Sequence, residues 1–162
     1  MRKVALVSSV IVALLAAVGL FSWSQARATS LKTVRLFEHD TQQANFSLGD
    51  KDTGQGNQFV FGGNLLDRAG GTKLGRVGGS CTTVSGTAAA PGDLVCSADF
   101  TLPHGQIMTH CFVEAAALFG GKSVPLTILG GTGVYRDAVG DGVFQAANQT
   151  DYSYVLRVSS AG

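Results

Sequence analysis

Short runs of alternating apolar and polar residues recur about every 10 to 15 residues from Thr29 onward, separated by glycine-rich joints. No stretch keeps the 3.6-residue periodicity of an amphipathic helix, so the pattern predicts strands. Gly and Pro in the joints occupy positions that reverse a chain, which favours hairpins between sequential strands. Eight strands are expected, over residues 33–40, 57–67, 72–85, 93–102, 105–115, 123–129, 140–147 and 151–159.

The strand pattern predicts an all-β fold, an eight-stranded antiparallel up-and-down β-barrel. Glycines inside the expected strands, such as Gly62, Gly63 and Gly78, allow the sharp bending that closure of a sheet demands. A two-sheet sandwich fits the same strand spacing and is the competing architecture. A barrel of this size holds side chains or one small ligand, so its interior is the expected place for a site.

The N-terminus has the pattern of a secretory signal peptide. Arg2 and Lys3 precede an apolar run from Val4 to Phe21, and Ala26-x-Ala28 follows it. Cleavage after Ala28 is expected, although an uncut run of this length could span a membrane. The prediction is therefore a signal peptide at 1–28 and one domain at 29–162, secreted to the extracellular space with no stable membrane association after cleavage.

Charge and composition exclude several classes of function. The chain has 12 Lys+Arg and 11 Asp+Glu, and three of the basic residues fall in the expected signal peptide. The remaining domain is slightly acidic and has no run of like charges, so nucleic-acid binding is not expected. His39, His104 and His110 show no metal-ligand spacing with the cysteines, so neither a metal site nor a cofactor is predicted.

Several motifs follow one another between residues 33 and 158, and the most specific is Gly130-Gly131-Thr132-Gly133-x-Tyr135-x-x-Ala138-x-Gly140. Others are Leu48-Gly49-Asp50 and Tyr152-x-Tyr154-x-Leu156. In this order they resemble the allene oxide cyclase barrel and dirigent-like superfamily, including its secreted actinobacterial members. The resemblance implies an eight-stranded barrel, often oligomeric, that binds an apolar intermediate inside and steers an intramolecular cyclisation or a stereoselective coupling.

The catalytic residues of the plant allene oxide cyclases are not matched. With Glu38-x-Asp40 aligned on the family's first-strand motif, Arg35 stands where the family has its catalytic Glu. Phe37 and Gly63 replace asparagines, and Ala44 replaces a proline. Whether the chain is an isomerase or cyclase is therefore open. The alternative is a non-catalytic secreted binding or structural module.

The family's pleat places Arg35 and Phe37 inside the barrel and turns Val34 and Leu36 outward toward a partner, which implies a homo-oligomer. On the second strand, Phe59, Phe61 and Gly63 share the inner face. The expected ligand-binding residues are Arg35, Phe37, Phe59, Phe61 and Gly63. The guanidinium of Arg35 would hold a carboxylate or enolate of an apolar small molecule. In the other reading, Arg35 pairs with Asp67 and the aromatic rings fill a core.

Cys81, Cys96 and Cys111 follow one another at equal spacing. Cys96 can therefore lie opposite either Cys81 or Cys111 in a hairpin, and export favours a disulfide. The spacing leaves both pairings open. The resemblance to secreted barrels implies the pair Cys81 and Cys96, with Cys111 free.

Overall fold

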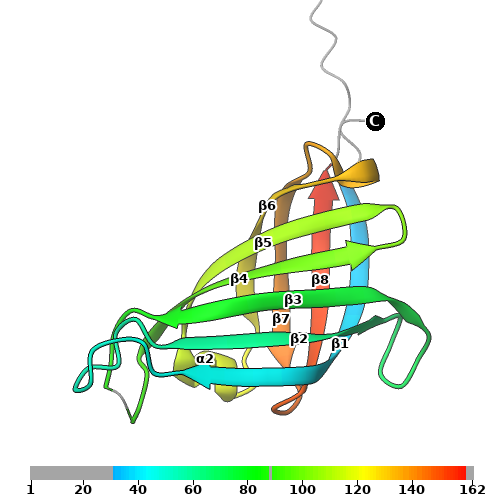
Figure 1. Ribbon diagram of the computed structural model, residues 1–162. Helices are drawn as coiled ribbons and strands as arrows, with labels where there is room; N and C mark the ends of the chain where they lie inside the picture. Colours follow the sequence, from blue (N-terminus) through cyan, green and yellow to red (C-terminus); the bar gives the residue numbers. More distant parts are fainter. Residues whose placement is uncertain (1–30, 88, 160–162) are drawn as a thin grey trace, which may run out of the picture.

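The computed structural model describes residues 31–87 and 89–159, which form one closed barrel (Figure 1). Its eight strands follow one another in chain order around the barrel, and every neighbouring pair is antiparallel. They are β1 (Leu31–Phe46), β2 (Gln58–Leu66), β3 (Lys73–Thr83), β4 (Asp93–Leu102), β5 (Gly105–Glu114), β6 (Val124–Gly131), β7 (Val139–Ala146) and β8 (Asp151–Ser159). The predicted fold class is confirmed.

The expected signal peptide at 1–28 lies outside the described residues. Within the described part of the chain, no helix is both long and apolar enough to cross a membrane.

Pairing of β1 with β8 closes the barrel. In this pair Val34 lies opposite Leu156, and Glu38 lies opposite Tyr152. Side chains alternate along each strand between the interior and the outer surface. One layer of the interior is filled by Phe100 of β4, Ile107 of β5 and Leu156 of β8, each with no exposed surface. This packed layer makes the barrel solid at that level, so any cavity must lie elsewhere along its axis.

A β-bulge in β1 changes which side chains face the interior. Asp40 pairs with Gly63 and Gln42 with Gly62, which leaves one extra residue on β1. Before the bulge the buried residues are the even-numbered Leu36, Glu38 and Asp40. A Cβ on Gly63 would lie 2.5 Å from the carbonyl oxygen of His39. Only glycine therefore permits the close approach of the two strands at the bulge.

The two ends of the barrel differ. A short helix, α2 (Ala115–Phe119), lies at the end where β1 finishes and β2 begins (Figure 1). β5 pairs with β6 only over Ile107–His110, because the chain leaves the sheet to form α2. A 3₁₀ turn, η1 (Gly133–Tyr135), lies between β6 and β7 at the other end. The α2 end is the one that carries the cavities described below.

The three cysteines form a row across β3, β4 and β5. Cys96 lies opposite Cys81 on one side and opposite Cys111 on the other, so both registers allowed by the spacing occur together. The disulfide joins Cys81 and Cys96 with an S–S distance of 2.03 Å, and Cys111 is a buried free thiol. The predicted pairing is confirmed.

We expect Cys96→Ala to lower the free energy of unfolding by about 3 kcal/mol, because it removes the crosslink and leaves Cys81 and Cys111 without a neighbouring partner. Cys111→Ala, measured in the same denaturant titration, should keep the disulfide and cost less. In the wild type, denaturation without reductant should release one reactive thiol per chain. A peptide map that links Cys96 to Cys111 would contradict the assignment.

Candidate functional site

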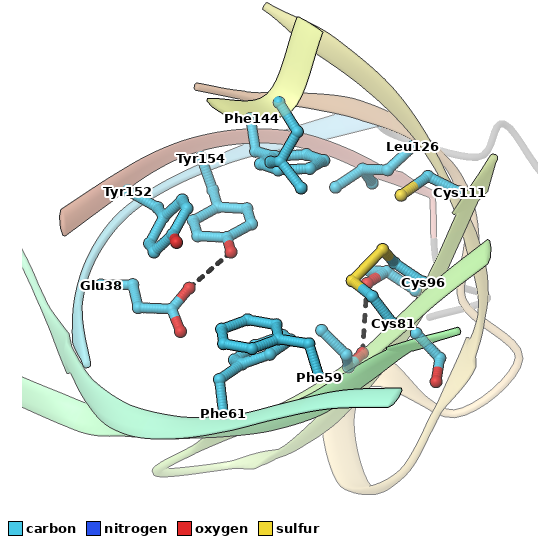
Figure 2. A pocket seen from close by; sticks show the side chains of 14 residues that line it. Glu38, Phe59, Phe61, Cys81, Cys96, Cys111, Leu126, Phe144, Tyr152 and Tyr154 are labelled. Atoms are coloured by element: carbon cyan, nitrogen blue, oxygen red, sulfur yellow. Dashed lines mark hydrogen bonds between the residues drawn. A yellow bond between two sulfur atoms is a disulfide. The ribbon is translucent and has the colours of Figure 1, made fainter. Parts of the chain in front are cut away.

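A small chamber of about 50 Å³ lies inside the barrel beside the cysteine row (Figure 2). Five aromatic residues line it, with Phe59 and Phe61 from β2 on one side and Phe144, Tyr152 and Tyr154 from β7 and β8 on the other. The rings of Phe59 and Phe61 stack at 5.8 Å between centroids, and those of Phe144 and Tyr154 at 5.6 Å. Glu38 is the one ionisable carboxyl in this lining.

Glu38 has no exposed surface, and its Oε2 lies 2.5 Å from the hydroxyl of Tyr154. Its Oε1 has no hydrogen-bond partner among the described residues. Burial raises the pKa of Glu38 to about 9, with a further contribution from a side-chain hydrogen bond to the carboxyl of Asp40. At neutral pH Glu38 is therefore a neutral carboxylic acid.

The Tyr154 hydroxyl is also protonated at neutral pH, because burial and the neighbouring Glu38 raise its pKa well above the usual value. With both groups protonated, the simplest arrangement has Tyr154 donating to Oε2 of Glu38 and the Glu38 proton on Oε1. Figure 2 shows this second oxygen turned toward the space beside Phe61. Glu38 is thus the one carboxylic acid in the chamber lining, and its proton can be donated either to Asp40 or to a group that enters the chamber.

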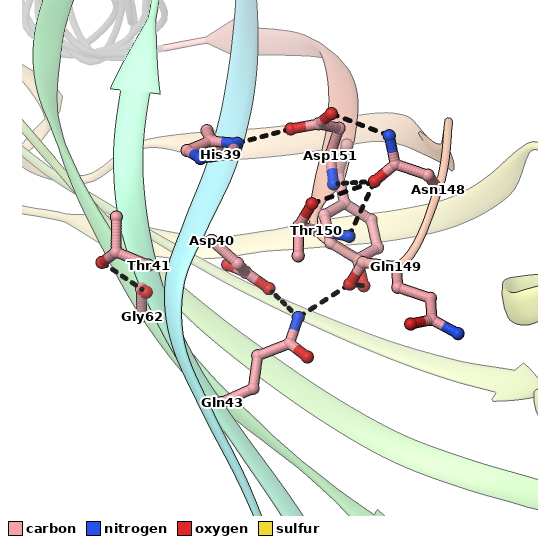
Figure 3. Close-up of polar contacts among 10 residues, drawn as sticks. His39, Asp40, Thr41, Gln43, Gly62, Asn148, Gln149, Thr150 and Asp151 are labelled. Carbon is pink, nitrogen blue, oxygen red and sulfur yellow. Dashed lines mark hydrogen bonds and ion pairs between the residues drawn. The ribbon is translucent and has the colours of Figure 1, made fainter.

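Asp40 lies one inward position further along β1 and is 5% exposed. Its Oδ2 accepts a hydrogen bond of 2.7 Å from Nε2 of Gln43, and the same amide nitrogen donates to the backbone oxygen of Gln149 (Figure 3). Oδ1 of Asp40 has no partner among the described residues. Gln43 therefore fixes Asp40 beside Glu38 and ties β1 to the turn between β7 and β8.

A second and much larger cavity of about 870 Å³ lies at the α2 end of the barrel. Four residues line both spaces, namely Phe59, Cys81, Leu118 and Tyr152, so the two cavities are adjacent. We call the larger one the mouth cavity. Its volume falls in the range of cavities that hold small-molecule ligands, about 300 to 1,000 Å³.

The chamber itself is too small for a whole ligand. A cavity of about 150 Å³ is needed to hold benzene, and the chamber has about one third of that volume. It can take a group of a few atoms, such as a carbonyl oxygen and its neighbours. A molecule in the mouth cavity could extend such a group past Phe59 toward Glu38.

The expected orientation of Arg35 and Phe37 is wrong. Arg35 is exposed and Phe37 is half-buried, and neither lines the chamber or the mouth cavity. The inward residues are instead Leu36, Glu38 and Asp40. A guanidinium cannot shed its charge, so its burial without a carboxylate partner is costly, whereas Glu38 becomes neutral by keeping its proton.

We expect Arg35→Met to change the free energy of unfolding by less than about 0.5 kcal/mol, because Arg35 lies on the exposed face of β1. Ligand binding in the barrel should also be unchanged. Chemical denaturation and a binding titration of this variant would check both points. A loss of several kcal/mol would mean that Arg35 makes interior contacts that the described structure does not contain.

The expected inner face of β2 is confirmed for the aromatic residues. Phe59 and Phe61 both line the chamber, and Phe59 also lines the mouth cavity. Gly63 lies in line with them and is buried, but it borders neither space. Its place beside the bulge gives it a role in strand packing. Whether Phe59 and Phe61 bind a ligand stays a prediction.

The sequence analysis missed Glu38 and Tyr154 as the central polar pair. The sequence did contain a signal for this pair. Glu38 follows the apolar Val34 and Leu36 at steps of two residues, and Tyr154 precedes Leu156 and Val158 at the same spacing. Reading the even-numbered residues of β1 as the apolar face would have placed Glu38 inside the barrel. The first and last strands of a closed barrel are neighbours, so Glu38 and Tyr154 would then lie on adjacent strands.

Other reactive groups contribute little here. Cys111 lines the chamber, but burial raises the pKa of its thiol to about 11, so it is not a nucleophile at neutral pH. Among the described residues, no group of three or more His, Cys, Asp or Glu side chains could hold a metal ion. Glu38, supported by Tyr154, is the carboxylic acid of the chamber, and the hydroxyls of Ser97 and Thr109 belong to the same lining.

Solved structures of the same fold include a demethylase, a dirigent protein and a Diels-Alderase. A pyocyanin demethylase is 23% identical, with a TM-score of 0.64 over 79% of this chain and 100% of its own. A pterocarpan synthase dirigent protein is 12% identical, with a TM-score of 0.66 over 83% and 90%. A Diels-Alderase from Streptomyces koyangensis is 21% identical, with a TM-score of 0.63 over 80% of this chain and 64% of its own. These likenesses establish the fold.

No curated protein matches the chain significantly. The model of the allene oxide cyclase barrel like domain matches residues 33–157, which include all the cavity-lining residues named above. The chain therefore belongs to the allene oxide cyclase barrel-like family.

Proposed function

We propose that the barrel binds an apolar small molecule in its mouth cavity and draws one oxygen-bearing group into the chamber. Glu38, as a neutral carboxylic acid, donates a hydrogen bond to that group. Bound in this way, a flexible molecule is steered into an intramolecular cyclisation or isomerisation. The observation that carries the proposal is a fully buried carboxyl that lines a chamber next to a ligand-sized cavity.

The proposed chemistry needs few groups. A cyclisation within one molecule gains most from being held in the reactive conformation, because the orientational entropy is lost on binding instead of in the transition state. A carboxylic acid that donates to a carbonyl oxygen stabilises negative charge as it develops there. Solved structures of this fold that are named as a Diels-Alderase, a cyclase and dirigent proteins support this class of reaction.

Binding can be tested with the methyl ether of methylumbelliferone, a neutral fluorescent lactone. We expect wild type to bind it and Glu38→Met, which removes both carboxyl oxygens, to bind it about tenfold less tightly, as for loss of one hydrogen bond to a buried group. Glu114→Met, the same change at an exposed position, is the control. Affinity should also decline as the pH rises through about 9, where Glu38 ionises. Equal binding by all three proteins would reject the role of Glu38.

Catalysis can be tested with a linear trienone in which a methylene tether joins an enone to a diene. The uncatalysed cycloaddition gives racemic bicyclic ketone, and a steering barrel should give an excess of one enantiomer, seen by chiral chromatography. The excess should disappear in Glu38→Met and persist in Glu114→Met.

The second candidate is a non-catalytic secreted binding module. The small volume of the chamber favours it, because only a few atoms can approach Glu38. Tight lactone binding together with racemic product at the uncatalysed rate would support this candidate over the cyclase.

We also propose that the chain is exported and cleaved after Ala28. The Cys81–Cys96 disulfide supports an oxidising compartment. The intact mass of protein recovered from culture medium should begin at Thr29. A cell-associated species that retains Trp23 would contradict export with cleavage.

We also propose a homo-oligomer. The expected contact through Val34 and Leu36 is not available, because Val34 is half-buried and Leu36 is buried inside the barrel. The outer surface of β5, β6 and β7 instead exposes Phe112, Leu129 and Val139. Light scattering should show an oligomer that Phe112→Ser weakens. A wild type that is monomeric at all concentrations would reject this.

A further inference from the structure

The mouth cavity has an unusual lining, because none of its described residues carries a charge. Six are carboxamides: Gln43, Asn45, Asn57, Gln58, Asn148 and Gln149. Carboxamides both donate and accept hydrogen bonds. The outer part of a ligand here would therefore meet neutral polar groups of both kinds.

Three of these carboxamides are used within the protein. Gln43 donates to Asp40, Asn57 accepts from the backbone N–H of Gly49, and Asn148 caps the turn before β8. Asn45 and Gln149 have exposed side chains. Asn45 follows the bulge and lies opposite Phe59 in the sheet, so it faces the same space as that ring. Asn45 and Gln149 are thus the amides best placed to bind a ligand.

Two exposed aromatic rings belong to the same lining. Phe46, at the end of β1, is 45% exposed, and Phe119, at the end of α2, is 65% exposed. Phenyl faces pack well against the C–H faces of saturated rings, while amides bind the hydroxyls at the edges of such rings. Phenyl rings and free amides in one cavity are the combination that suits a sugar.

A negative charge would be poorly tolerated at this place. The lining of the mouth cavity holds no cation to pair with it. A desolvated anion without a partner is costly. The absence of charge therefore discriminates between neutral and acidic sugars.

We infer that the natural ligand is a neutral glycoside, with an apolar carbonyl-bearing head toward the chamber and an uncharged sugar in the mouth cavity. This inference rests on the proposed function for the position of the head. It assigns the ligand's outer half, which that proposal leaves open.

The test uses three fluorescent probes that share one lactone head: the methyl ether of methylumbelliferone, methylumbelliferyl glucoside and methylumbelliferyl glucuronide. The last two differ only in that a carboxylate replaces a hydroxymethyl group. We expect the glucoside to bind tightest and the glucuronide about tenfold or more weaker than it, because its charge is unpaired. Asn45→Lys should reverse that order by supplying a cation. Gln42→Lys, an exposed position on the same strand outside the mouth lining, should leave it unchanged.

The outcomes separate the two proposals. If the methyl ether binds and depends on Glu38 but the glucoside is no tighter than the ether or the glucuronide, the sugar site is rejected and the head site stands. If the glucoside binds in preference to both other probes, with no effect of Glu38→Met, the sugar site stands and the proposed role of Glu38 fails. If none of the probes binds, both proposals are rejected.

Discussion

Replacing Glu38 with Gln should make the protein more stable at neutral and alkaline pH, by about 3 kcal/mol at about pH 7. Below about pH 4.5, Glu38 is protonated in both the folded and the unfolded chain, so its acidity does not affect stability. Between about 4.5 and 9 the unfolded chain loses the proton while the folded chain keeps it. Wild type therefore loses stability as the pH rises through this window, by about 1.4 kcal/mol per pH unit, and no further above it.

Gln keeps an oxygen that can accept from Tyr154, but it does not ionise, so this loss should be absent in the variant. Urea titrations of wild type and Glu38→Gln across the pH range would show curves that meet near pH 4.5 and separate above it. Glu114→Gln, at an exposed position, should follow wild type. Parallel curves for wild type and Glu38→Gln would mean that Glu38 titrates as an ordinary glutamate.

Phe100→Ala should lower the free energy of unfolding by about 3 to 5 kcal/mol. The Phe100 ring has no exposed surface and meets Tyr154 edge to face, with centroids 4.9 Å apart. Its removal leaves a void in the packed layer beneath the chamber. It also frees Tyr154 to shift, so binding of the lactone probe should weaken together with stability.

Phe61→Ala is the matched comparison. Phe61 is half-buried and already borders empty space in the chamber, so its loss enlarges a cavity rather than creating one. We expect its cost to be less than half that of Phe100→Ala in the same denaturant titration. Equal losses for the two variants would show that the chamber is closed and packed in solution, which would weaken the proposed site.

Strand positions were predictable because local alternation and turn residues determine them. The strands expected at 93–102 and 151–159 match β4 and β8 to the residue. β1 was expected to end at Asp40 but continues to Phe46. Its last part, Thr41–Phe46, is mostly polar, and a local pattern cannot show that polar residues continue a strand along the mouth cavity.

The polar centre of the site was less predictable, because it depends on contacts between distant residues. Either Arg35 or Glu38 faces the interior, depending on which face of β1 points inward. The burial of Leu36 and the hydrogen bond from Tyr154 on β8 place Glu38 inside. The bulge after Asp40 then brings Gln43 beside Asp40. Neither the pairing across the closure of the barrel nor the bulge has a signature within β1 alone.

The central claim is that Glu38 holds its proton at neutral pH, and infrared difference spectroscopy tests it most directly. The carbonyl band of a protonated carboxyl group is distinct from the bands of a carboxylate. Wild type minus Glu38→Gln, at about pH 7, should show the protonated band, and the band should disappear as the pH passes about 9. A carboxylate signal for Glu38 at neutral pH would contradict the account. So would a protonated band that persists in Glu38→Gln and is lost in Asp40→Asn, because the proton would then belong to Asp40.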